Sequence, residues 1–98
     1  MLESELQTKC IVWLRNTYPD EVLIANVHGG GWGNKGFPDM LICIKGRFIT
    51  CELKVGDNTL QPSQRMWKKK IEEAGGHWYE ARTLERFKEI VEDELKKD

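Results

Sequence analysis

The chain has 98 residues, of which 40% are apolar and 32% are charged, and its formal net charge at pH 7 is −1. These values predict one small globular domain over residues 1–98 and exclude a membrane protein, because no apolar run approaches the ~20 residues of a membrane span. The charge shows no basic excess of the kind that nucleic-acid binding usually produces, although residues 65–70 form a local basic cluster. The acidic start of the chain lacks the features of a signal peptide, so we expect a cytoplasmic protein.

The first predicted elements are a helix and a short strand. In residues 2–16, Leu6, Cys10 and Leu14 recur at a helical spacing, which places them on one face. Residues 18–20 end this helix, and the apolar residues 22–27 predict a strand. A loop with five glycines follows over residues 28–37.

The middle of the chain predicts a β-hairpin. Residues 40–44 form an unbroken apolar run, as expected for a strand that is covered on both faces. Gly46-Arg47 predicts a two-residue type II′ turn because glycine stands first. Residues 47–55 then form the return strand.

The last third of the chain predicts a helix, a strand and a helix. Pro62 suits the first turn of a helix that ends near Ala74, before two glycines. Residues 77–81 form a short strand, and Thr83 caps a final helix that reaches Leu95. The predicted order, α-β-β-β-α-β-α, indicates an α/β fold with a mixed central sheet flanked by helices.

The expected turn fixes which hairpin residues share a face. It pairs Lys45 with Phe48, and the same register sets Asp39 opposite Lys54. Directly opposed residues share a face, and so do alternate residues of one strand. Asp39, Glu52 and Lys54 are therefore predicted to converge at the end of the hairpin remote from the turn.

A pair of carboxylates beside an amine is the chemistry of a metal-dependent phosphodiesterase. Neighbouring carboxylates repel each other, and a divalent cation such as Mg²⁺ or Mn²⁺ removes that repulsion. The ion activates water and neutralises phosphate charge, while the Lys54 ammonium can stabilise the developing negative charge. The alternative interpretation is an ordinary salt bridge from Asp39 or Glu52 to Lys54 on a solvated sheet face.

These residues also resemble a known pattern. Gly36-Phe37-Pro38-Asp39, followed by a strand and Glu52-Leu53-Lys54, is similar to the motif of PD-(D/E)XK nucleases. Gln61-Pro62-Ser63-Gln64 and Ala74-Gly75-Gly76 extend the resemblance to the VRR-NUC family in its stand-alone phage and bacterial form. The resemblance spans residues 3–91 and implies a restriction-endonuclease-like fold with an α-β-β-β-α-β core.

The resemblance implies roles for individual residues. Asp39 and Glu52 would bind the metal ion together with the backbone carbonyl of Leu53. Lys54 would be the catalytic lysine, and Gln64 would reach the active site or the substrate backbone as a further catalytic residue.

Two positions depart from the family pattern. Gln61 stands where the family often has Thr or Ser, and Gln7 stands where many relatives carry an acid on the first helix. Glu3 lies one turn before Gln7 on the same face, so both residues are candidates for positions beside the site.

Basic and aromatic residues near the motif are candidates for DNA contacts. The glycine-rich loop should border the site, where Lys35 could meet a phosphate and Trp32 could stack on a base, although a flexible surface loop is the alternative. Arg65, Lys68 and Lys69 are expected on the exposed side of the second long helix, as a phosphate-contacting patch or a solvated charged face.

Cysteines and most tryptophans are expected in the core. This set comprises Cys10, Cys43, Cys51, Trp13, Trp67 and Trp78. Of the two histidines, His28 is a minor candidate for a metal ligand or a base, and His77 is expected to be structural.

The resemblance implies a divalent-metal-dependent endonuclease that hydrolyses phosphodiester bonds in DNA, with Mg²⁺ or Mn²⁺ as cofactor. One short chain offers one site, so cutting both strands of branched or duplex DNA implies a homodimer, similar to Holliday-junction resolvases of DNA repair. The alternatives are a nicking, flap or restriction-like nuclease, and a catalytically silent DNA-binding module of the same fold. We expect the protein to act in a bacterial or phage-infected bacterial cell.

Overall fold

A computed structural model describes residues 1–27 and 35–97 of the chain. These residues form three α-helices and four β-strands, in the order α1 (Glu3–Thr17), β1 (Val22–Asn26), β2 (Met40–Ile44), β3 (Arg47–Leu53), α2 (Pro62–Glu73), β4 (His77–Ala81) and α3 (Leu84–Lys96). The predicted order is confirmed, and only the end of β3 differs from its prediction by more than one residue. Within the described ranges, no helix is long and apolar enough to cross a bilayer.

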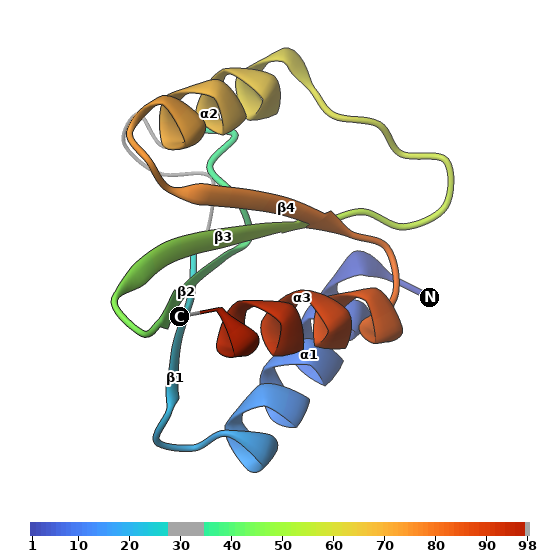
Figure 1. Ribbon diagram of the computed structural model, residues 1–98. Helices are drawn as coiled ribbons and strands as arrows, with labels where there is room; N and C mark the ends of the chain where they lie inside the picture. Colours follow the sequence, from blue (N-terminus) through green and yellow to red (C-terminus); the bar gives the residue numbers. More distant parts are fainter. Residues whose placement is uncertain (28–34, 98) are drawn as a thin grey trace.

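The strands form one mixed sheet in the order β1-β2-β3-β4. β2 pairs antiparallel with both β1 and β3, whereas β4 runs parallel to β3. The parallel pair requires a crossover, which α2 provides. Figure 1 shows α1 and α3 on one face of the sheet and α2 on the other, so the predicted α/β fold is confirmed.

The hydrophobic core lies between the sheet and the layer of α1 and α3. Alternate residues of β2 and β3 point into it, as the period of a strand requires. Its fully buried members include Leu6, Cys10, Leu14, Met40, Ile42, Ile44, Ile49, Cys51, Leu53, Phe87 and Val91. The predicted face of α1 is therefore the face that is buried.

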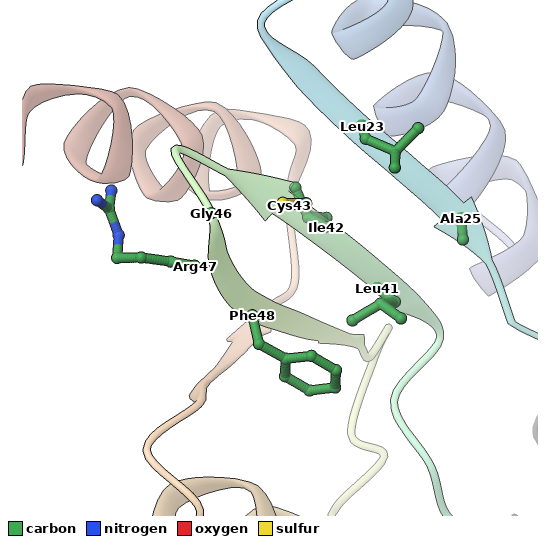
Figure 2. A pocket seen from close by; sticks show the side chains of 8 residues that line it. All are labelled: Leu23, Ala25, Leu41, Ile42, Cys43, Gly46, Arg47 and Phe48. Atoms are coloured by element: carbon green, nitrogen blue, oxygen red, sulfur yellow. The ribbon is translucent and has the colours of Figure 1, made fainter.

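The other face of β1 and β2 is open, which corrects one expectation. Leu23 is 72% exposed and Cys43 is also exposed, because α2 packs over β4 rather than over β2. Figure 2 shows Leu23, Leu41 and Phe48 around this open surface. The expectation that β2 is covered on both faces was wrong, and so was the expectation of a buried Cys43.

The hairpin turn also differs from its prediction. Ile44 pairs with Arg47, so the turn residues are Lys45 and Gly46, with φ of 53° and 79°. Two positive φ angles are typical of a type I′ turn, whose twist matches that of the flanking strands. The register is therefore shifted by two residues from the predicted one, and a shift of two leaves every side chain on its predicted face.

A buried carboxylate fastens the end of α3 to the sheet. Glu94 is 0% exposed, and its carboxylate accepts hydrogen bonds from Arg47 Nε at 3.0 Å, Tyr79 Oη at 2.6 Å and Lys97 Nζ at 2.6 Å. His77 Nδ1 lies 3.2 Å from the same carboxylate. Burial alone would raise the pKa of Glu94, but the bonds from Lys97, Tyr79 and Arg47 lower that pKa to about 2. His77 is thus part of a structural network.

Candidate active site

The acidic residues of the motif lie where β2 begins and β3 ends, at the end of the sheet remote from the hairpin turn (Figure 1). Met40 pairs with Cys51, and continuing this register sets Asp39 opposite Glu52 rather than opposite Lys54 as predicted. The two carboxyl groups share a hydrogen bond, and the Lys54 ammonium acts on Glu52 through its charge. The predicted convergence on one face therefore survives the change of register.

Hydrogen bonds hold both carboxyl groups in place. The backbone N–H of Leu53 donates to Oδ2 of Asp39 at 2.8 Å, and Nε2 of Gln64 donates to Oε1 of Glu52 at 3.2 Å. Glu52 is 2% exposed and Lys54 is 6% exposed. The structure thus brings together the four residues that the sequence singled out, Gln64 included.

The first turn of α2 is fixed against the segment that carries Asp39. Oε1 of Gln64 accepts a hydrogen bond from the backbone N–H of Gln61 at 2.8 Å, which aims the amide nitrogen at Glu52. Gly36 has a φ of +86°, and a Cβ there would lie 2.6 Å from the carbonyl oxygen of Ser63. Only glycine allows this close approach, so Gly36 sets the spacing between α2 and the start of β2.

Burial and like charge make Glu52 a weak acid. Burial raises the pKa of Glu52, and the hydrogen bond to Asp39 and the charge of Asp39 raise it further, to about 9. The charge of Lys54 offsets part of this rise, and that of Glu3 adds to it. In the protein alone, Glu52 therefore keeps its proton at neutral pH.

This donor set fits a hard divalent cation. A proton now relieves the repulsion between the two carboxyl groups, and a cation in the same place would do so with more charge. Within residues 1–27 and 35–97, no three His, Cys, Asp or Glu side chains form a metal-binding group. The remaining ligands would be backbone, water or phosphate oxygens, as is usual for Mg²⁺.

The backbone carbonyl of Leu53 suits the role of a further ligand. The register of β2 and β3 sets Leu53 opposite Pro38, whose nitrogen carries no hydrogen to donate. The Leu53 N–H has turned to the Asp39 carboxylate instead. The strand pairing therefore ends beside the carboxyl pair, with a carbonyl oxygen that Pro38 cannot engage.

Residues from α1 border the site. The half-buried Glu3 has a raised pKa, through burial and then the charge of Asp39, with Lys54 opposing the rise. Nε2 of Gln7 donates to Oδ1 of Asn26 and to the carbonyl oxygen of Asp39, the latter at 3.4 Å. Asn26 was not anticipated. Its one sequence signal is a polar amide at the end of an apolar strand.

The residues suggested for DNA contacts fall into three groups. Lys35, Arg65 and Lys69 are exposed near the site, whereas Lys68 is half-buried with its ammonium 4.8 Å from the ring centroid of Trp78. Lys68 thus does not lie on a freely solvated face. Trp32 and the other residues of 28–34, His28 among them, lie outside the described residues.

The tryptophan expectation needs a correction. Trp13 packs against the core, but Trp67 and Trp78 are partly exposed and lie apart from it. The ring of Trp67 instead meets that of Phe37, with 5.0 Å between centroids and an interplanar angle of 77°. Trp67 and Phe37 lie next to the site rather than in the core, because α2 covers the opposite face of the sheet from α1 and α3.

Comparison with known proteins identifies the fold. No family model and no curated protein matches the sequence. Among solved structures, the chain is similar to one described as a "VRR_NUC domain", with a TM-score of 0.70 and 16% sequence identity. The similarity covers 92% of this chain and 94% of that chain. The chain therefore has the fold of a VRR_NUC domain, as the sequence resemblance implied.

Proposed function

We propose that this chain is a VRR-NUC nuclease, a divalent-metal-dependent endonuclease that hydrolyses phosphodiester bonds in DNA. The observation that carries the proposal is the pairing of the half-buried Asp39 with the buried Glu52, beside the buried Lys54, in a VRR_NUC fold. A structural salt bridge on a solvated face would not need two carboxyl groups, nor the hydrogen bond that Gln64 gives to one of them. The alternative interpretation of the motif is thereby disfavoured.

The residues of the site divide the chemical work. Asp39, Glu52 and the Leu53 carbonyl would hold Mg²⁺ or Mn²⁺, which would supply an activated water and offset phosphate charge. Lys54 donates to the attacking water or to a phosphate oxygen as negative charge develops there. Gln64 orients the Glu52 carboxylate through the hydrogen bond from its amide nitrogen. Water forms a bond to phosphorus and gives up a proton to solvent, while the bond to the leaving oxygen breaks and that oxygen takes up a proton from solvent.

The finer parts of the proposal concern substrate and assembly. One chain carries one site, so cleavage of two strands requires two chains, and we propose a homodimer that acts on branched DNA in the manner of a junction resolvase. Exposed Lys35, Arg65 and Lys69 provide positive charge for phosphate contacts near the site. Glu3 and Gln7 support the site from α1, Gln7 through the Asp39 carbonyl.

A cleavage assay tests the proposal. A four-way junction, a flap, a duplex and a single strand of matched sequence are incubated with Mg²⁺, Mn²⁺ or EDTA. We expect paired cuts in the junction that require metal and that Glu52→Ala abolishes, and a mass in light scattering of twice the 11.4 kDa chain. The matched control is Glu89→Ala, an exposed acid of α3 that should leave cleavage unchanged.

The outcomes separate the parts of the proposal. Binding without cleavage of any substrate would identify a catalytically silent module. Cleavage of the flap or duplex alone would refute junction selectivity, and a monomer mass at working concentration would refute the dimer.

A further inference from the structure

A cavity lies along α2, on the side of the helix that carries Trp67. It measures about 410 Å³ and is formed by the later turns of α2 and the residues that follow them, by Phe37 before β2 and by Phe48 of β3. The side chains that line it include Phe37, Phe48, Trp67, Lys70, Ile71 and Ala74. Its size falls within the range of small-ligand sites, and its walls are largely aromatic and apolar.

The aromatic walls are held in place before any ligand arrives. Nε1 of Trp67 donates a hydrogen bond to the carbonyl oxygen of Lys35 at 3.0 Å, which fixes the indole ring. The ring of Phe37 packs against it in an edge-to-face arrangement. A planar ligand would therefore meet a preformed surface, and little side-chain entropy would be lost when it binds.

The cavity shares its two supporting elements with the carboxyl pair. Phe37 lies two residues before Asp39 in the chain, and Trp67 lies three residues after Gln64 on α2. Three residues of helix correspond to about 4.5 Å along the axis. The cavity extends from Trp67 to Ala74, about 4.5 to 15 Å along the helix axis from Gln64, so a ligand in it would lie a few nucleotides from a phosphate at Glu52.

Charge indicates the class of ligand. Lys70 lies with its ammonium 5.3 Å from the ring centroid of Trp67, and it is an exposed side chain. A cation–π contact at an exposed position is weaker than the stacking of a base on an aromatic ring. A base can therefore displace the ammonium from the ring, and the displaced Lys70 can pair with the adjoining phosphate.

We propose that this cavity binds the base of an unpaired nucleotide close to the scissile phosphate. The inference rests on the proposed nuclease function and deepens it, because it names the feature of DNA that the enzyme selects. Flaps and single strands offer unpaired bases, whereas an intact duplex keeps its bases stacked. An aromatic ring stacks on any base, so the cavity selects unpaired structure and not sequence.

Binding in EDTA tests the cavity without cleavage. Fluorescence anisotropy is measured with a labelled single strand and with the duplex of the same sequence. Ala74→Leu fills the cavity from an exposed position with an ordinary φ of −82°, and Ala74→Ser is its matched control. We expect Ala74→Leu to weaken single-strand binding about 10-fold and duplex binding less than about 2-fold, in line with the loss of one stacked base. Ala74→Ser should bind like wild type.

Trp67 variants give a second measurement. Trp67→Phe should retain most of the single-strand affinity, whereas Trp67→Leu should lose it to the same extent as Ala74→Leu. Unchanged single-strand binding in Ala74→Leu, or equal losses for both DNAs, would overturn the cavity but leave the nuclease standing. A change of oligomeric mass in Ala74→Leu would instead assign the cavity to a protein interface. A wild type that binds no DNA would overturn both proposals.

Discussion

Glu52 is a residue at which function and stability oppose each other. The pKa of its carboxyl group is about 9 in the folded protein, against an ordinary value of 4.5. Between these two pH values the folded protein retains a proton that the unfolded chain has lost, so stability falls as pH rises from 4.5 through 9. Such a cost is typical of a residue that is kept for its chemistry.

Glu52→Gln should therefore stabilise the protein while it removes the metal site. In EDTA at pH 8 we expect a higher Tm than that of wild type, because the Glu52 carboxyl group must take up a proton on folding at this pH, whereas the amide is already neutral. Addition of Mg²⁺ should raise the Tm of wild type but not that of the variant. Thermal melting followed by circular dichroism measures both effects. An equal Mg²⁺ shift in the two proteins would contradict the assignment of Glu52 as a ligand.

The convergence of the site residues was predicted from the sequence although the hairpin turn was assigned to the wrong residues. Asp39, Glu52 and Lys54 meet on one face although the hairpin register was wrong, because a slip of two residues preserves the faces of a strand. The family resemblance implied that Gln64 reaches the active site or the substrate backbone, and the structure gives Glu52 as its partner there. The bond from Gln7 to Asn26 had no such signal, since it depends on how α1 docks against the end of β1.

The strand β2 shows why an apolar run can mislead. A strand that is buried on both faces and a strand with one open face can carry the same residues, and only the coverage by α2 distinguishes them. α2 crosses from β3 to β4 and leaves the outer face of β1 and β2 free (Figure 2). The sequence pattern predicts the extent of α2 but not the direction in which this helix crosses the sheet, so the coverage of β2 could not be predicted.

The reactivity of the three cysteines distinguishes the buried face of the sheet from its exposed face. Burial raises the pKa of Cys10 to about 12 and that of Cys51 well above its ordinary range, whereas Cys43 is exposed. Because the thiolate is the reactive form, we expect one of the three thiols to react rapidly with a disulfide reagent at pH 8 in the native protein. Cys43→Ser should lose this rapid phase and keep the wild-type Tm. A rapid phase that persists in Cys43→Ser would contradict the observed faces.

The network around Glu94 joins three elements into one body. Its partners come from the start of β3, from β4 and from the residue after α3. A carboxylate with a pKa of about 2 stabilises the fold above its ordinary pKa of 4.5, and this contribution is lost as pH falls from 4.5 towards 2. The lost contribution is on the order of 3 kcal/mol.

Glu94→Gln should consequently lower stability at pH 7 but not at pH 2. Urea unfolding at both pH values measures the difference, and Glu92→Gln, an exposed neighbour on α3, is the control. The gap between wild type and Glu94→Gln should narrow as pH falls. A gap that stays constant with pH would mean that the carboxylate contributes through packing and not through charge.

The fold of the whole molecule is similar to that of a solved structure, although comparison of sequences finds no matching family model or curated protein. The chain shares 16% of its residues with a VRR_NUC domain over nearly its full length, and no family model matches it. The residues on which the sequence resemblance rests have tightly restricted physical roles: a glycine at a close approach, two carboxyl groups and a lysine at the ends of adjoining strands, and a glutamine on the next helix. The docking of helices and the open sheet face leave weaker traces, because many apolar residues satisfy them.

The rate of DNA cleavage by Lys54→Ala tests the nuclease assignment most directly. Single-turnover cleavage with Mn²⁺ is compared for wild type, Lys54→Ala and Lys9→Ala, an exposed lysine of α1, and DNA binding in EDTA is measured in parallel. We expect Lys54→Ala to bind DNA normally and to cleave at least about 100-fold more slowly than wild type. An effect of this size is typical when one group that stabilises transition-state charge is lost. Lys9→Ala should cleave like wild type. Cleavage by Lys54→Ala at the wild-type rate would contradict the site, and with it the proposed function.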